Sequence, residues 1–123
     1  TTFLGFVDNV TREKYIKKAA LFIFCSHEDF GIAPVEALAS GIPVVAYEAG
    51  GALDYIKPEK NGWFFSEQTD SSLIETLEKL PGKKVSPTKI SATANEFSAA
   101  IFHKAIKNIV DKSWKEHYRE NRN

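Results

Sequence analysis

The stretch LFIFCSHEDFGIAPVEALASGIPVVAY, residues 21 to 47, decides the fold. Its two ends, 21–25 and 43–47, are apolar at nearly every position, which is typical of strands covered on both faces. Between them, Pro34 suits the first turn of a helix over 34–40, and Gly41 suits the left-handed position that follows such a helix. A strand, a short helix and a second strand in this order predict a unit of a parallel sheet.

The same alternation continues on both sides of this stretch. It predicts an α/β fold, with a Rossmann-like parallel sheet and helices on both faces. Before this stretch we expect a strand at 3–7 and a helix capped by Thr11 that runs to 19 or 20, with Tyr15, Ile16 and Ala19 facing inward. After it we expect a helical turn at 52–56, a strand at 63–65 and a helix from 71 or 72 to 80, which Pro81 and Gly82 end.

A long amphipathic helix is expected at the end of the chain. Phe97 and Phe102 flank Ser98 at the spacing of a hydrophobic staple around a helix N-cap. Apolar residues then recur along one face as far as Trp114, which predicts a helix to about residue 118. We therefore divide the chain into a Rossmann-like domain, 1–97, and a C-terminal helix, 98–123, that packs on it.

Charge and composition exclude several functions. The 16 basic and 16 acidic residues balance, and residues 19–56 contain five acids and no Lys or Arg, so the clustered cations that grip nucleic acid are missing there. The longest apolar run, 19–25, is too short to cross a bilayer. The single Cys25 predicts a buried, reduced thiol in a cytosolic protein. Residues 103–123 are basic and interleaved with acids, which favours a solvated helix face, with attraction to an anionic membrane as the alternative.

Two acidic residues lie where open parallel sheets bind ligands, beyond the carboxyl end of a strand. Glu28 lies in the turn after the strand at 21–25, and Glu36 lies about one turn into the next helix. Phe30, Gly31 and Ile32 place backbone N–H groups at the positive end of that helix. Carboxylates without a nearby cation accept hydrogen bonds from hydroxyl groups, which predicts a sugar, a ribose or both. The alternatives are an exposed loop acid at Glu28 and an ordinary first-turn acid at Glu36.

The segment EDFGIAPVEALASGIPV, residues 28–44, together with Gly50 and Gly51, resembles the signature of the retaining glycosyltransferases of family 4. The resemblance extends over about residues 3–80 and more loosely over Phe97 and Ser98. The segments EDFGI, GGAL and FFSEQT are similar to those of O-antigen-type mannosyltransferases. Asp54 stands where the family usually has Glu, and we assign it no functional role.

This resemblance implies the C-terminal part of a GT-B domain, in which residues 1–97 form a partial nucleotide-sugar-binding Rossmann-like domain. It implies that Glu28 is the catalytic residue that meets the donor sugar, and that Glu36 binds the ribose hydroxyls of the nucleotide. Backbone groups of Phe30, Gly31 and Ile32 would meet the sugar hydroxyls and the diphosphate. Neither a metal nor a cofactor is expected.

The predicted function is the donor-binding portion of a retaining glycosyltransferase of polysaccharide biosynthesis. The parent would transfer mannose from GDP-mannose to a glycan or lipid-linked acceptor, which binds through an N-terminal domain outside this chain, and the fragment alone would be inactive. We expect a cytoplasmic protein, with peripheral association at the inner face of the membrane as an open alternative. Two other hypotheses remain: a non-catalytic binding or scaffold module, and another GT-B enzyme such as a sugar-nucleotide epimerase.

Overall fold

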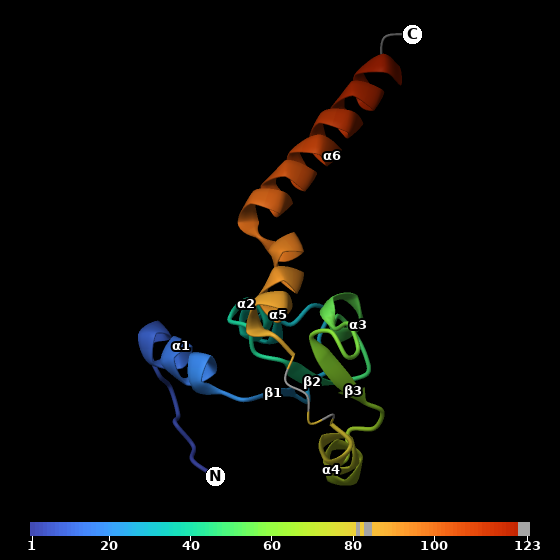
Figure 1. Cartoon of the computed structure of the whole chain (residues 1–123). Helices are drawn as coiled ribbons and strands as arrows, with labels where there is room; N and C mark the ends of the chain where they lie inside the picture. Colours follow the sequence, from blue (N-terminus) through green and yellow to red (C-terminus); the bar gives the residue numbers. More distant parts are fainter. Residues whose placement is uncertain (81, 83–84, 121–123) are drawn as a thin grey trace.

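The computed structural model describes residues 1–80, 82 and 85–120. Helices and strands alternate through the first half of the chain, and helices alone follow (Figure 1). The elements are α1 (Asn9–Lys18), β1 (Phe22–Phe24), α2 (Ile32–Ala39), β2 (Val44–Tyr47), α3 (Ala52–Tyr55), β3 (Gly62–Phe65), α4 (Asp70–Glu78), α5 (Pro87–Thr93), the short 3-10 helix η1 (Asn95–Phe97) and α6 (Ala99–Glu120).

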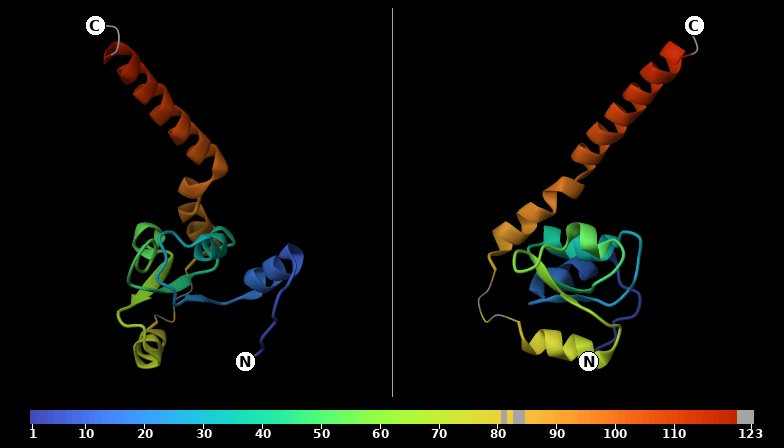
Figure 2. Two further views of the ribbon diagram at one scale, coloured as in Figure 1. Left: turned by 180° about the vertical axis from the view of Figure 1, so that it is seen from behind. Right: turned by 90° about the vertical axis from the view of Figure 1, so that its right-hand side faces the viewer.

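The three strands form a parallel sheet in the order β1-β2-β3. Phe24 of β1 lies opposite Ala46, and Ala46 lies opposite Phe64 of β3. Helices α2, α3 and α5 lie on one face of the sheet and α4 lies on the other (Figures 1 and 2). The predicted fold class, a parallel α/β sheet with helices on both faces and a long final helix, is confirmed.

The core lies between β2 and the layer of α2 and α5. Leu38, Val44 and Ile90 are fully buried there. Gly41, with φ +79°, ends α2 as predicted, and a Cβ at this position would lie 2.9 Å from the backbone oxygen of Pro87. A glycine is therefore required both by the backbone conformation and by the close approach of α5.

Asn61 is a fully buried polar residue that links three segments. Its amide nitrogen donates to the backbone oxygen of Tyr55 and to the hydroxyl of Thr93, at 2.9 and 2.8 Å. Its amide oxygen accepts from the backbone N–H of Lys57 at 2.6 Å. These bonds fix α3 and the turn before β3 against α5.

The predicted strand at 3–7 is wrong: these described residues are mostly exposed and form no strand. The side chains of Phe3 and Phe6 are 93% and 101% exposed, and Gly5 has φ +62°, which interrupts an extended backbone. A strand is stable only when a neighbour pairs with it, and the described sheet ends at β1.

Helix α1 begins earlier than predicted. Its N-cap is Asp8, not Thr11, because the Asp8 carboxylate accepts the backbone N–H of Thr11 at 2.7 Å. This hydrogen bond lowers the pKa of Asp8 below its usual value. Of the predicted inward stripe, Ile16 and Ala19 pack against the core, whereas Tyr15 is 54% exposed.

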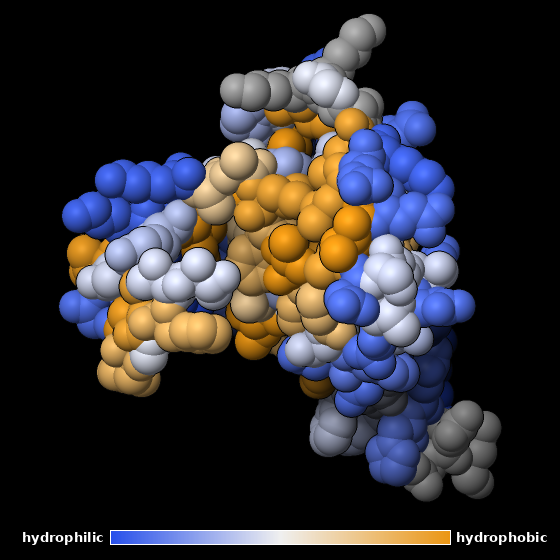
Figure 3. Space-filling model, turned by 90° about the horizontal axis from the view of Figure 1, so that it is seen from below, coloured by the Kyte–Doolittle hydropathy of each residue, from blue (hydrophilic) through white to orange (hydrophobic). Residues whose placement is uncertain are grey.

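Strand β1 is not covered on both faces as predicted. Ile23 is 45% exposed because α4 packs beneath β3 and leaves the underside of β1 open. Apolar side chains gather at the centre of this face when the molecule is seen from below (Figure 3). Cys25 is also exposed rather than buried, since it follows the last residue of β1.

After β3, one helix begins earlier than predicted, and a second helix was not predicted. The cap of α4 is Thr69, whose hydroxyl accepts the backbone N–H of Ser72 at 3.2 Å, so the helix begins before Ser71. Pro81, predicted to end it, lies outside the described residues.

Helix α5 is absent from the sequence prediction, because its sequence PTKISAT is mostly polar and buries a single residue, Ile90.

Helix α6 begins after Ser98, as predicted, but it does not pack on the domain. It projects away from the other elements (Figures 1 and 2). All residues from 99 to 119 are exposed, because the helix leaves η1 in a direction that carries it off the sheet layers. The division of the chain at residue 97 remains a prediction. Within the described residues, α6 and the other helices are too short or too polar to span a bilayer.

Candidate functional site

The loops that follow the three strands meet at the carboxyl end of the sheet. The side-chain amide of Gln68, beyond β3, donates to the backbone oxygen of Cys25 at 2.7 Å. The backbone N–H of Gly51, beyond β2, donates to the backbone oxygen of Glu28 at 2.8 Å. The loop after β1, which carries the predicted site residues, is thus held from two neighbouring loops.

Gly50 and Gly51 form the floor beneath this loop. A Cβ at Gly50 would lie 2.4 Å from the backbone oxygen of Glu28, and a Cβ at Gly51 would lie 2.4 Å from that of Asp29. Contacts this short do not occur between real side chains and backbone atoms. The paired glycines therefore allow the loop to lie directly on the residues that follow β2.

Gly31 joins the loop to α2. It is the N-cap residue with φ +88°, a conformation that favours glycine. A Cβ there would lie 2.7 Å from the hydroxyl oxygen of Tyr55. The N–H groups of the first turn of α2 have no partner within the helix. Gly31 therefore lies at the positive end of the helix, next to these N–H groups.

Phe30 and Ile32 lie on either side of Gly31. The Phe30 ring makes edge contacts with the rings of Tyr55 and Phe97, with centroids 5.8 and 5.6 Å apart. Phe30 is 40% exposed and Ile32 is 69% exposed. The backbone at Phe30 is therefore anchored by its ring, while the start of α2 stays open to solvent.

Tyr55 is a site residue that the sequence analysis missed. It is 1% exposed, and its hydroxyl oxygen is buried without a hydrogen-bond partner among the described residues. Burial raises the pKa of Tyr55 to about 12, and the negative charges of Glu28 and Asp54 act in the same direction. The phenol is therefore a proton-bearing donor at neutral pH. A tyrosine after GGALD gives no signal of this role, because the loop that covers it lies more than twenty residues earlier.

Glu28 is exposed at the surface of the loop. Its backbone is fixed by Gly51, and its charge acts on the Tyr55 hydroxyl below. The structure thus brings Glu28, Phe30, Gly31 and Ile32 together at the carboxyl end of the sheet, as the sequence predicts.

Glu36 has a different neighbour. Its two carboxylate oxygens accept from the guanidinium of Arg12 at 2.7 and 3.2 Å. The pair lies in a groove of about 310 Å³ between α1 and α2, and the two side chains are 38% and 45% exposed. Sequence proximity gave no sign of this cation, because Arg12 is 24 residues away. Glu36 therefore faces α1, whereas the Glu28 loop rests on the residues before α3.

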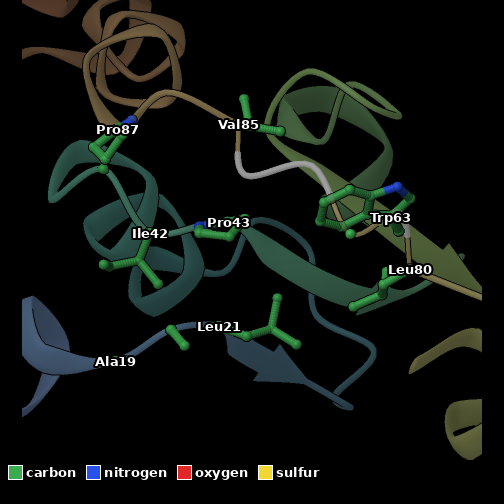
Figure 4. Close-up of a pocket in the computed structure, with 11 residues that line it drawn as sticks. Ala19, Leu21, Ile42, Pro43, Trp63, Leu80, Val85 and Pro87 are labelled. Atoms are coloured by element: carbon green, nitrogen blue, oxygen red, sulfur yellow. The ribbon is translucent and has the colours of Figure 1, made fainter. Parts of the chain in front are cut away.

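A cavity of about 450 Å³ lies at the opposite, amino end of the strands (Figure 4). Leu21, Pro43 and Trp63 contribute to it from the starts of the three strands, and Leu80 and Val85 close it. Its lining is apolar and contains none of the predicted site residues. In the part of the chain that the structure describes, His, Cys, Asp and Glu side chains form no group of three or more that could hold a metal.

The family described as Glycosyl transferases group 1 matches residues 1–97. The chain therefore belongs to this family. Several curated relatives match parts of the chain. This chain spans less than a fifth of the length of each curated relative described below.

An uncharacterised glycosyltransferase of Methanocaldococcus jannaschii is 44% identical over 71 residues, which are 56% of this chain and 18% of that protein. The alpha-1,3/1,6-mannosyltransferase alg-2 of Neurospora crassa is 37% identical over 79 residues, 63% of this chain and 17% of that protein. The poly(glycerol-phosphate) alpha-glucosyltransferase of Bacillus subtilis is 34% identical over 105 residues, 84% of this chain and 14% of that protein.

Two solved structures share the fold and place it among GT-B proteins. HepE of Anabaena, in complex with UDP and glucose, has a TM-score of 0.71 and 25% identity, over 90% of this chain and 32% of that one. The sucrose-phosphate synthase of Thermosynechococcus elongatus has a TM-score of 0.68 and 24% identity, over 96% of this chain and 30% of that one. The O-antigen type of the sequence resemblance stays a prediction.

Proposed function

We propose that this chain is the donor-binding part of a retaining glycosyltransferase that transfers mannose from GDP-mannose to a glycan or lipid-linked acceptor. The observation that carries the proposal is the loop from Glu28 to Ile32, seated on Gly50 and Gly51 at the carboxyl end of a parallel sheet. Open sheets bind ligands at that end. HepE, similar over most of this chain, was solved with UDP and glucose.

The loop supplies two kinds of group to a nucleotide sugar. The N–H groups at the start of α2 bind oxygens of the sugar or the diphosphate, since a helix N-terminus favours negative charge. The exposed carboxylate of Glu28 meets the sugar and stabilises the positive charge that develops at its anomeric carbon, without any metal in the step.

Glu36 binds the ribose hydroxyls in this proposal, and Arg12 must then leave its carboxylate. The pair is half-exposed, and exposed ion pairs contribute only about 0.2–1 kcal/mol. Hydrogen bonds from hydroxyls to a charged group contribute about 1.5–3 kcal/mol. Ribose therefore replaces Arg12 at a small cost.

Mannose is favoured by the fungal relatives, since those of Neurospora crassa and Eremothecium gossypii are both mannosyltransferases by name. A glucosyl donor such as UDP-glucose is the second candidate. It is supported by the alpha-glucosyltransferase of Bacillus subtilis and by the contents of the HepE structure. We place the whole protein in the cytoplasm, at the inner face of the membrane when the acceptor is lipid-linked.

The experiment is an assay of the complete protein that carries this chain, with a panel of labelled nucleotide sugars. We expect turnover of GDP-mannose with retention of the anomeric configuration. Glu28→Gln should lower turnover about 100-fold or more with donor affinity little changed, whereas Glu78→Gln, an exposed acid on α4, should change neither. Turnover of UDP-glucose but not of GDP-mannose would make UDP-glucose the donor in place of GDP-mannose. Donor binding without turnover would favour the non-catalytic module.

A further inference from the structure

We propose that Tyr55 is a positioning residue, whose hydroxyl donates a hydrogen bond to the carboxylate of Glu28 when a nucleotide sugar is bound. The inference deepens the proposed function and rests on it. Tyr55 itself does not touch the donor, because it is 1% exposed and lies beneath the backbone of Gly31.

The first observation is the unpaired hydroxyl. Tyr55 is the residue whose buried side-chain oxygen lacks a partner within the described part of the chain. Leaving a hydroxyl buried and unpaired costs about 1–3 kcal/mol, so the Tyr55 hydroxyl calls for an explanation. Phenylalanine would fill the same space without that cost.

The second observation is the direction of the ring. Tyr55 is held by edge contacts to Phe30 and Phe97, at 5.8 and 6.3 Å between centroids. Its hydroxyl reaches to 2.7 Å from the point where a Gly31 Cβ would lie. The hydroxyl is thus fixed under the junction of the Glu28 loop and α2, where the proposed donor binds.

The third observation is that Glu28 is close to the hydroxyl but is not bound to it. The negative charge of Glu28 acts on the Tyr55 phenol, whose oxygen has no hydrogen-bond partner among the described residues. The Glu28 side chain is exposed, while the backbone of its loop is held by the bonds from Gly51 and Gln68. In the proposal, a bound donor turns the Glu28 side chain so that its carboxylate meets the hydroxyl.

The hydrogen bond has a chemical consequence for transfer. A carboxylate that accepts one hydrogen bond from a fixed phenol is held in one rotamer. It then already faces the anomeric carbon before the reaction, so its side chain does not have to be ordered during the transfer step. The phenol keeps its proton throughout, so no proton is transferred. The contribution therefore belongs to turnover rather than to donor affinity.

The test compares Tyr55→Phe with Tyr15→Phe, which removes an exposed hydroxyl on α1. In the unliganded chain, Tyr55→Phe should raise the denaturation midpoint, because it removes an unpaired buried group, and Tyr15→Phe should leave it unchanged. In the complete protein, Tyr55→Phe should lower kcat about tenfold with the donor KM within twofold. A lower midpoint for Tyr55→Phe would show that the hydroxyl already has a partner, and would overturn the inference.

A double-mutant cycle with Glu28→Gln separates positioning from a structural role. If Tyr55 acts through Glu28, Tyr55→Phe lowers kcat in the wild-type background and has no further effect in the Glu28→Gln background. Equal losses in both backgrounds, or an unchanged kcat, would overturn the inference and leave the proposed function standing. A wild-type protein that binds no nucleotide sugar would instead overturn the proposed function, and this inference with it.

Discussion

The loops at the carboxyl end of the sheet lie in close backbone contact with one another, whereas the long helix α6 leaves its apolar side chains exposed. Around the loops, backbone atoms meet at distances that leave no room for a single Cβ at Gly50 or Gly51. Along α6, apolar residues such as Ile109 and Trp114 are 61% and 64% exposed. The comparison teaches that an amphipathic pattern specifies a helix, whereas close packing needs matching surfaces that the pattern does not contain.

The largest expected effect tests this contrast with one pair of truncations. Leu38→Ala, in the fully buried interface of α2 with the sheet, should lower the free energy of unfolding by about 2–5 kcal/mol, because it leaves a cavity. Ile109→Ala on α6, 61% exposed, should lower it by less than about 0.5 kcal/mol. Denaturant titration of both variants measures the difference. A cost for Ile109→Ala equal to that of Leu38→Ala would show that α6 packs on the domain in solution.

The next effect tests the floor of the site. Gly51→Ala should lower the free energy of unfolding by about 1–3 kcal/mol, since the new Cβ must displace the backbone of Asp29 and Phe30. Gly82→Ala is the matched control, because a Cβ there meets nothing within 4 Å. If the two alanine variants are equally stable by thermal or chemical unfolding, the loop does not rest on Gly51.

A third effect is the alkaline dependence of stability. The pKa of Tyr55 is raised to about 12 in the folded chain, against about 10 for an unfolded tyrosine. Below pH 10 the phenol is neutral in both states and does not change the stability with pH. As the pH rises from 10 to 12 it ionises in the unfolded chain first, so the fold loses stability over this range. Between these values the wild type should lose more stability than Tyr55→Phe, in which the other tyrosines and the lysines titrate alike. Parallel losses in the two proteins would show that the phenol ionises freely in the folded state.

The smallest effect concerns the ion pair of Arg12 and Glu36. Because both side chains are half-exposed, Arg12→Ala should cost less than about 1 kcal/mol of stability, similar to Lys17→Ala, which breaks an exposed pair within α1. Donor affinity of the complete protein should not fall, because Arg12 competes with ribose for Glu36. A large loss of affinity in a binding titration would make Arg12 a ligand of the donor instead.

Local pattern is enough to predict the parts of the fold that depend on neighbours in sequence. β2, β3, the turn at Gly41 and the position of Glu28 in the loop after β1 all follow from apolar runs and from glycine and proline positions. For the same reason, the place of the candidate loop 28–32 at the carboxyl end of the sheet follows from the strand before it and the helix after it.

The rest depends on residues far apart in the chain. Arg12 reaches Glu36 across 24 residues, and the Tyr55 hydroxyl lies under Gly31 only because α3 packs against the loop. Helix α5 is polar except for Ile90, so its pattern is too weak to predict. The tail at 3–7 has the composition of a strand but no neighbour in the described sheet.

The central claim, that the loop at the carboxyl end of the sheet binds a nucleotide sugar, is tested most directly by amide chemical shifts of this chain. It would be titrated with guanosine, GDP and 2′,3′-dideoxyguanosine. We predict millimolar affinity, on the order of −4 kcal/mol, with shifts at 28–36 and at Gly50 and Gly51 that disappear with the dideoxy compound. Equal shifts with all three compounds would contradict the binding of ribose by Glu36. Shifts around the apolar cavity at the amino end of the strands, without shifts at 28–36, would contradict the central claim.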